Sequence, residues 1–371
     1  MTRPHQERIG PMGVAVVGCG TISDQYLTNL TAFPDLRVVF CADLDKERAR
    51  AQAERYGVPA WGGVDEALAR PDVELVVNLT VPAAHAEVGH AAVAAGKHVW
   101  NEKPLATDSA AARGLLDAAD AAGLRVGCAP DTFLGAGLQS ALRLIRDGAI
   151  GTPLTALSLM QTPGPESWHP SPEFLFQPGG GPLFDMGPYY LTALVNVFGP
   201  VRRVSAVGGR SKARRVIGSG PRAGTEFDVT VPTHVSALLE FEGGGSATAV
   251  FSFESPQLRL GFVEVTGLDA TLVLPDPNHF DGPSRVEDGG PGREAPHSGA
   301  TDGRGMGVLD MARSIRAGEA HRASGELALH VVEVMEAIDG SVEAAGPVEV
   351  TSRFPMPAAL PEGWDPRTGS I

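Results

Sequence analysis

Cysteine is scarce in this chain, with three residues among 371. Cys19, Cys41 and Cys128 lie far apart in apolar stretches, without zinc-ligand spacing or a paired redox motif, so we expect buried thiols in a reducing cytoplasm. Long apolar runs are also missing, and none approaches the roughly 20 residues needed to cross a bilayer. The first twelve residues are polar, which disfavours a secretory signal and predicts a flexible leader over residues 1–12.

Positive charge is in deficit, with 30 Lys and Arg against 44 Asp and Glu and a formal net charge of -14. This balance argues against nucleic acid as a partner, because phosphate binding needs a basic surface. The ten histidines form no ligand pair at metal-binding spacing, so we expect no metal. The length predicts two domains. The composition is that of an ordinary globular protein.

Short apolar runs alternate with Ala-rich amphipathic stretches up to about residue 130. The apolar runs are Val14–Val17, Leu36–Ala42, Leu75–Leu79, Lys97–Trp100 and Leu124–Cys128. Valine-rich strands that lack polar alternation and are separated by helices are typical of a parallel sheet covered on both faces. The sequence therefore predicts a doubly wound Rossmann domain over residues 13–130.

A different pattern fills residues 131–371. Helical patterns at 138–147 and 188–198 flank a loop rich in Pro, Gly and Trp at 162–182. Strand-like runs follow without intervening helices, at 201–208, 234–241, 246–253, 261–266 and 271–274. We expect a surface excursion over 275–305 and two further helices at 307–317 and 325–343. The pattern predicts an α+β domain with a large, mostly antiparallel sheet.

The first apolar run leads directly into Gly18-Cys19-Gly20-Thr21-Ile22-Ser23 and then a helical pattern. The first glycine permits a tight turn, the second lets the backbone approach a pyrophosphate, and the helix N-terminus at Thr21 and Ile22 offers N–H groups. Asp43 lies at the end of the second apolar run, 23 positions after Gly20.

An acidic residue at this place accepts bonds from ribose hydroxyls and repels a 2′-phosphate, so NAD is favoured over NADP. Lys46 and Arg48 lie close enough in sequence to keep NADP open. A helix N-cap or turn role is the alternative for Asp43.

Two further segments carry a family resemblance. They are Val99-Trp100-Asn101-Glu102-Lys103-Pro104-Leu105-Ala106 and Gly179-Gly180-Gly181-Pro182-Leu183-Phe184-Asp185-Met186-Gly187-Pro188-Tyr189-Tyr190. With the glycine-rich loop they resemble the Gfo/Idh/MocA oxidoreductases over nearly the whole chain. The resemblance implies a dehydrogenase acting on a hydroxyl of a sugar, sugar derivative or cyclitol, with a C-terminal domain (131–371) that covers the nicotinamide and builds a homodimer or homotetramer.

The resemblance also implies the site residues. The family lysine maps onto Lys103 and the family aspartate onto Asp185, while Tyr189 stands where many members have histidine, as in tyrosine-using members such as glucose-fructose oxidoreductase. The turn containing Thr80, Pro82 and His85 passes over the cofactor in this family, and Glu102 adjoins it. We interpret Glu102 mainly as a residue that holds the loop.

Hydride transfer requires proton transfer at the substrate oxygen. Tyr189 has an ordinary pKa of about 10, which an ammonium such as that of Lys103 would lower. Asp185 would bind a substrate hydroxyl, with a helix N-cap as the alternative, and Tyr189 could instead be a core residue beside Tyr190. Trp168 and His169, in the loop before the glycine run, are candidates for binding the sugar.

Two other functions stay open at this point. One is an NAD-dependent lyase or glycosidase that oxidises the sugar transiently and recycles the bound cofactor. The other is a noncatalytic NAD-binding sensor, which the combination of Lys103, Asp185 and Tyr189 disfavours because a sensor needs none of these groups.

Overall fold

The computed structural model describes residues 9–371. Its contacts divide the chain into two units. The parallel-sheet unit comprises the residues up to Gly135 together with Gly299–Val332 and Pro357–Ile371, and the mixed-sheet unit comprises Ala136–Ser298 and Glu333–Met356. Most of the expected leader lies outside the described residues, and the expected boundary at 130/131 stays a prediction.

Six parallel strands form the sheet of the first unit, in the order β3-β2-β1-β4-β5-β6. They are β1 (Met12–Val17), β2 (Leu36–Ala42), β3 (Trp61–Gly62), β4 (Leu75–Asn78), β5 (His98–Asn101) and β6 (Val126–Cys128). Every residue of β1 is buried, because this central strand is covered on both faces. The order reverses between β1 and β4, so the predicted Rossmann fold is confirmed and its switch point lies after β1.

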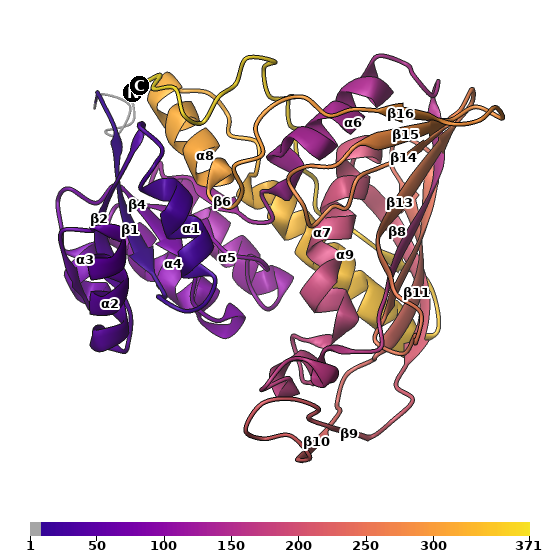
Figure 1. Cartoon of the computed structure of the whole chain (residues 1–371), viewed down its shortest axis with the longest axis horizontal. Helices are drawn as coiled ribbons and strands as arrows, with labels where there is room; N and C mark the ends of the chain where they lie inside the picture. Colours follow the sequence, from indigo (N-terminus) through magenta and orange to yellow (C-terminus); the bar gives the residue numbers. More distant parts are fainter. Residues whose placement is uncertain (1–8) are drawn as a thin grey trace. The chain divides into compact units, whose positions relative to one another are not determined.

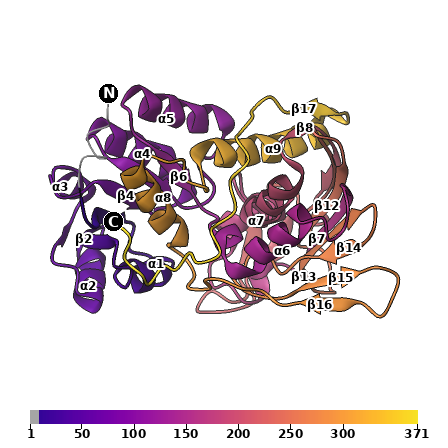
Figure 2. The same cartoon turned by 90° about the horizontal axis from the view of Figure 1, so that it is seen from above.

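Helices cover both faces of this sheet. They are α1 (Ser23–Leu30), α2 (Lys46–Tyr56), α3 (Val64–Leu68), α4 (His85–Ala94), α5 (Ser109–Ala121) and α8 (Met306–Ala317). Figure 2 shows α4 and α5 on one side and α1, α2 and α8 on the other. Asp131 holds the start of α8, since its buried Oδ2 accepts the Gly305 and Gly307 N–H groups at 2.9 and 3.1 Å.

Nine strands form the sheet of the second unit, in the order β16-β15-β14-β13-β7-β12-β11-β8-β17. They are β7 (Pro153–Gln161), β8 (Val201–Gly209), β11 (His234–Phe241), β12 (Ser246–Ser252), β13 (Arg259–Gly267), β14 (Thr271–Val273), β15 (Ser284–Glu287), β16 (Arg293–Ala295) and β17 (Val348–Glu349). Only the β7–β12 pair among these is parallel. The expected large, mostly antiparallel sheet is confirmed.

One face of this sheet packs on helices, as Figure 1 shows for α7. The helices are α6 (Ala136–Arg146), α7 (Gly181–Phe198) and the part of α9 (Gly325–Ala344) that belongs to this unit. Residues of β11 alternate between buried and accessible, as expected for a sheet with one covered face. A separate hairpin pairs β9 (Arg214–Val216) with β10 (Glu226–Asp228). The other elements within residues 9–371 are the short helices η1 (Pro82–Ala84) and η2 (Thr132–Leu134) of the first unit, and η3 (Pro165–Ser167) and η4 (Glu173–Phe176) of the second.

Two expectations for local structure are wrong. The stretch 275–305 contains the sheet strands β15 and β16 rather than only a surface excursion, because short strands between Gly and Pro give little sequence signal. Helix α7 begins at Gly181, not Pro188. Pro182 occupies its first turn, where a missing N–H costs nothing, and Pro188 lies inside the helix.

No helix within residues 9–371 is both long and apolar enough to cross a membrane.

Candidate active site

The two glycines of the loop after β1 meet different structural demands. Gly18 has a φ of +94°, and a Cβ there would lie 2.6 Å from the Leu79 carbonyl carbon, so the turn itself requires glycine. A Cβ on Gly20 would meet nothing within 4 Å. The protein therefore leaves open space above the Gly20 backbone, which fits the close approach of a dinucleotide pyrophosphate.

The start of α1 completes this loop. Its N-cap residue Ile22 makes no side-chain capping bond, and anion binding at this helix N-terminus stays a prediction. Ser23 takes the third small position, fully buried, with its Oγ donating to the Gly20 carbonyl at 2.6 Å. Thr21 is exposed beside it. Direct contacts of Gly20, Thr21 and Ile22 with a cofactor stay predictions.

Asp43 follows β2 and braces the glycine loop. Its Oδ2 accepts the Cys19 N–H at 2.8 Å, and its Oδ1 accepts the Asp45 N–H at 2.9 Å. The N-cap of α2 is Asp45, so the alternative capping role does not apply to Asp43, although Asp43 does hold the turn. A carboxylate has about four acceptor positions, so capacity for ribose hydroxyls remains.

The two basic residues after Asp43 are engaged by carboxylates. Lys46 Nζ lies 3.1 Å from Glu66 Oε1. Arg48 lies 3.9 Å from Asp43 and 3.8 Å from Asp45. All these cationic side chains are more than half exposed, so the pairs are weak in energy, but they place negative charge around each cation.

The loop after β5 holds Lys103 in a defined backbone position. Glu102 is 8% exposed, and its Oε2 accepts the Lys103 N–H at 2.8 Å while its Oε1 accepts the Tyr26 hydroxyl of α1 at 2.8 Å. The Lys103–Pro104 peptide is cis. Glu102 therefore links the Lys103 loop to the helix that follows the glycine loop, in agreement with the structural role expected from the sequence.

The turn after β4 contains the other predicted cofactor residues. Thr80 donates its hydroxyl to Asn78 Oδ1 at 2.6 Å, and Pro82 is exposed at the start of η1. His85 differs from them because its side chain is completely buried. Cofactor contacts of Thr80, Pro82 and His85 stay predictions.

Asp185 and Tyr189 belong to the mixed-sheet unit and lie four residues apart in α7, so they share one helix face. Asp185 is inside the helix, whose N-cap is Gly180, so the alternative capping role is excluded. Both tyrosines are buried, with Tyr189 6% and Tyr190 0% exposed, so burial does not distinguish their roles. The Tyr190 hydroxyl accepts the Gly261 N–H at 2.7 Å, its ring meets Phe251 edge-on at 5.9 Å, and burial raises its pKa.

The loop before α7 presents an aromatic trio. Trp168 is 67% exposed and Phe174 is 59% exposed, and the His169 ring lies between them in edge contacts of 5.6 and 5.5 Å. His169 Nδ1 accepts the Ser171 N–H at 3.0 Å, so the neutral ring carries its proton on Nε2. The sequence names Trp168 and His169 as candidates for sugar binding, which stays a prediction, and gives no signal for Phe174 beyond this first aromatic pair.

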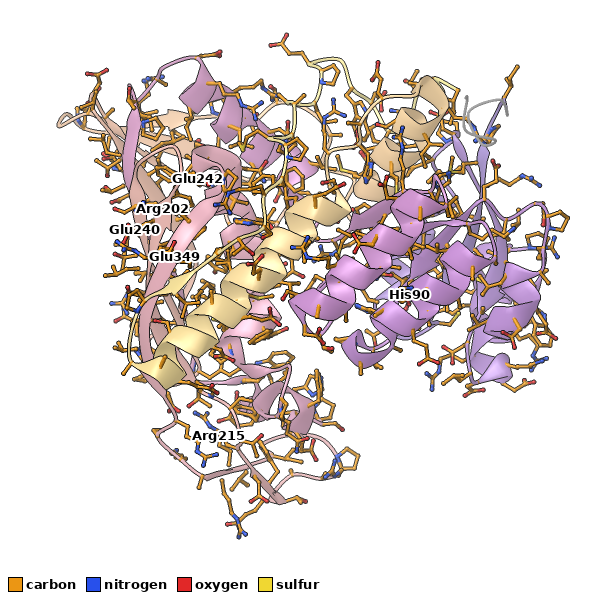
Figure 3. The ribbon with its side chains drawn as sticks, turned by 180° about the vertical axis from the view of Figure 1, so that it is seen from behind. His90, Arg202, Arg215, Glu240, Glu242 and Glu349 are labelled. Carbon is orange, nitrogen blue, oxygen red and sulfur yellow. The ribbon has the colours of Figure 1, made fainter. Side chains whose placement is uncertain are left out.

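Arg215 of β9, which is labelled in Figure 3, anchors this aromatic loop. Its side chain is 4% exposed, forms ion pairs with Glu166 of η3 and with Glu254, and covers the Phe176 ring at 5.1 Å. It also donates to the carbonyl of Phe253 at 3.1 Å. Its partners are distant in sequence, so no local pattern could have found this anchor.

Within residues 9–371, no group of three or more His, Cys, Asp or Glu side chains could hold a metal ion.

Known families match both parts of the chain. Residues 12–129 match a family model described as "Oxidoreductase family, NAD-binding Rossmann fold", and residues 138–273 match the model "GFO/IDH/MocA C-terminal domain".

Among curated proteins, the chain is 33% identical over 257 residues to dTDP-3,4-didehydro-2,6-dideoxy-alpha-D-glucose 3-reductase of Streptomyces violaceoruber, covering 68% of this chain and 70% of that protein. It is 30% identical over 249 residues to trans-1,2-dihydrobenzene-1,2-diol dehydrogenase of Oryctolagus cuniculus, covering 64% and 68%.

Solved structures share the fold. Levoglucosan dehydrogenase in complex with NADH and L-sorbose superposes with a TM-score of 0.80 at 21% identity, over 92% of this chain and 99% of that chain.

Proposed function

The chain belongs to the Gfo/Idh/MocA family of NAD(P)-binding oxidoreductases, and from that premise we propose that it is an NAD-dependent dehydrogenase or ketoreductase. It transfers hydride between nicotinamide and a secondary hydroxyl or ketone of a sugar, sugar derivative or cyclitol. One observation carries the proposal: Glu102 links the Lys103 loop to helix α1, which follows the glycine loop with open space at Gly20.

The choice of NAD rests on the charges at the end of β2. Asp43 is braced by the glycine loop and keeps acceptor capacity for the ribose hydroxyls. A 2′-phosphate would meet this carboxylate, and the two nearby cations, Lys46 and Arg48, already face Glu66, Asp43 and Asp45. Electrostatics therefore favours the cofactor without the extra phosphate.

The cofactor, when bound, supplies the nicotinamide C4 that gives or takes hydride. Tyr189 holds the proton that leaves or joins the substrate oxygen, and the Lys103 ammonium favours its phenolate form. Asp185 accepts a bond from a neighbouring substrate hydroxyl, since it shares a helix face with Tyr189. Tyr189 takes the acid/base role in this proposal because it stands where many family members have histidine, and because the Tyr190 hydroxyl already accepts the Gly261 N–H.

The aromatic trio gives the proposed substrate a binding surface. The faces of Trp168 and Phe174 can cover the C–H surface of a sugar ring, and the Nε2–H of His169 can donate to a hydroxyl. A reducing cytoplasm suits the three buried free cysteines.

Variants of the acid/base pair test the chemistry. Lys103→Ala and Tyr189→Phe should each lower kcat about 100-fold or more on any confirmed sugar substrate while leaving NADH binding within about threefold. Wild-type turnover by Lys103→Ala would contradict the proposal.

A fluorescence titration tests the preference for NAD over NADP. We expect NADH to bind at least about tenfold more tightly than NADPH, and Asp43→Ala to narrow that ratio. Equal or tighter binding of NADPH by the wild-type protein would remove the argument from Asp43.

A further inference from the structure

His85 occupies an unusual place between two loops of the parallel-sheet unit. Its side chain is fully buried at the start of α4. Nδ1 lies 2.6 Å from the Pro104 carbonyl oxygen, and Nε2 lies 3.0 Å from the Thr80 carbonyl oxygen. The ring therefore connects the turn after β4 with the loop after β5 that carries Lys103.

Both partners of His85 are backbone carbonyls, which only accept hydrogen bonds. Burial is the largest influence on His85 and lowers its pKa, against the two carbonyls and Glu102, which raise it, while Lys103 lowers it further. The neutral ring that results at neutral pH has one N–H. The shorter contact is to Pro104, so the proton belongs on Nδ1 and the bond to the Lys103–Pro104 loop is the one made.

Two buried asparagines strengthen this link. Asn78 at the end of β4 donates to Asn101 Oδ1 at the end of β5 at 2.9 Å and to the His85 carbonyl at 3.2 Å. Asn101 in turn donates to the carbonyl of Leu105 at 3.0 Å. The backbone carbonyl of Pro104 is thus tied to α4, and that of Leu105 is tied through Asn101 to β4, by side chains that water does not reach.

We propose that His85 is a positioning residue for the reaction: its Nδ1–H bond to the Pro104 carbonyl holds the loop that carries Lys103 at the place where the lysine acts on the acid/base. The proposal rests on the proposed function and assigns His85 an indirect role in place of a cofactor contact. A histidine that touched NAD would need an accessible ring, and this ring is enclosed.

Paired substitutions separate the contributions of the two ring nitrogens. The amide nitrogen of Asn replaces Nδ1, and that of Gln replaces Nε2, so His85→Asn keeps the bond to Pro104, whereas His85→Gln can donate only toward the Thr80 carbonyl. We expect His85→Asn to retain kcat within about threefold of wild type and His85→Gln to lose about tenfold or more, with NADH dissociation constants unchanged within about threefold. The pH midpoint of kcat should rise in His85→Gln, since a displaced Lys103 no longer favours the phenolate.

His98→Gln is the matched control. His98 is 1% exposed in the same sheet at the start of β5, where its Nδ1 accepts the Arg125 N–H at 3.0 Å. Its loss should lower Tm but leave kcat and the pH midpoint of kcat unchanged. This comparison separates loss of any buried imidazole from loss of the bond to the Lys103 loop.

Each possible outcome of these measurements either supports or overturns the proposal. Higher kcat in His85→Asn than in His85→Gln, by about threefold or more at matched NADH binding, supports the proposal. A smaller ratio, a reversed order or an unshifted pH midpoint overturns it. If His85→Gln does not fold, His85→Asn decides alone, and a loss beyond about threefold overturns the proposal. Undiminished turnover by Lys103→Ala would instead refute the proposed function, whatever the His85 variants do.

Discussion

Glycine is needed at two positions of the cofactor loop for two different reasons. Gly18 has positive φ and touches the backbone after β4, whereas Gly20 has open space above it. Gly18→Ala should therefore lower the free energy of unfolding by about 2 kcal/mol or more, since it combines a left-handed backbone with a clash.

Gly20→Ala should leave stability within about 0.5 kcal/mol, because its new methyl meets no protein atom. The same methyl should weaken NADH binding by about tenfold or more, since it fills the space predicted for the pyrophosphate. Urea unfolding and NADH fluorescence on both variants check this pair. Tight NADH binding by Gly20→Ala would contradict the placement of the cofactor.

Sequence motifs could predict single residues but not the contacts that assign their roles. Lys103 and Asp43 follow from motifs whose spacing reflects a strand, a turn and a helix. The brace from Asp43 to Cys19 and the carbonyl partners of His85 depend on segments far apart in the chain. A motif that names His85 therefore cannot tell a cofactor contact from a bond that holds a loop.

Among the secondary-structure elements, the β9–β10 hairpin stabilises the aromatic loop through one buried cation. Replacing Arg215 with Met leaves the carboxylates of Glu166 and Glu254 without their partner, at a cost of about 3–5 kcal/mol if both stay ionised. Because the loop carries the aromatic trio, KM for the sugar should rise while NADH binding stays unchanged.

Arg214→Met is the control for this prediction. Arg214 is the neighbour of Arg215 on β9, is 67% exposed and pairs with Glu226 and Asp228 at the surface. Its loss should cost less than about 1 kcal/mol and leave KM unchanged. Thermal unfolding and sugar saturation curves compare the two variants. Equal effects of the two substitutions would refute the anchoring role.

Glu333 ties helix α9 to the segment that contains Thr351 and Ser352. Burial raises the pKa of this carboxyl, but bonds from Ser352 and Thr351 outweigh burial and lower it to about 2. A depressed folded pKa gives stability that is present in full above the unfolded value, near 4.5, and is lost as pH falls toward 2. Tm of the wild-type protein should fall through this window.

Glu333→Gln should lower Tm at neutral pH and flatten the fall of Tm between pH 4.5 and 2. Scanning calorimetry at several pH values measures both effects. A Tm profile identical to that of the wild-type protein would contradict the assignment.

The strength of sequence signals differed between the two sheets. Strands β1, β2, β4, β5 and β6 are apolar runs because both sheet faces are covered, so their composition alone predicts them. Strands β9, β10, β15 and β16 have three or four residues, a length at which a period-2 pattern cannot be told from chance. Their pairing depends on partners that the sequence does not identify.

For the whole molecule, we predict a homodimer or homotetramer whose contact surface is the uncovered sheet face of the mixed-sheet unit. Val207 is 71% exposed on β8 and Leu238 is 57% exposed on the paired strand β11. Arg202 and Glu240 form an ion pair on the same two strands, and both are marked in Figure 3. An apolar centre beside charged residues is the pattern of a protein interface.

Leu238→Lys should shift the protein toward monomer, because a charge in an apolar interface has no partner. Leu268→Lys is its control, since Leu268 is 67% exposed in the turn between β13 and β14. Light scattering after size-exclusion chromatography measures both masses. A wild-type monomer, or equal masses for wild type and Leu238→Lys, would contradict an interface at Leu238.

The most direct test of the proposed dehydrogenase activity follows the transferred hydrogen with a deuterium label. A panel of sugars and cyclitols, each deuterated at a single secondary carbinol carbon, is incubated with the protein and NAD. The reduced cofactor is then analysed by mass spectrometry and NMR. We predict that at least one compound yields NADH with deuterium at C4 of nicotinamide, in step with oxidation of the same carbon. Absence of reduced cofactor across the panel, with no reduction of the matching keto-sugars by NADH, would contradict the claim that this protein is a sugar or cyclitol dehydrogenase.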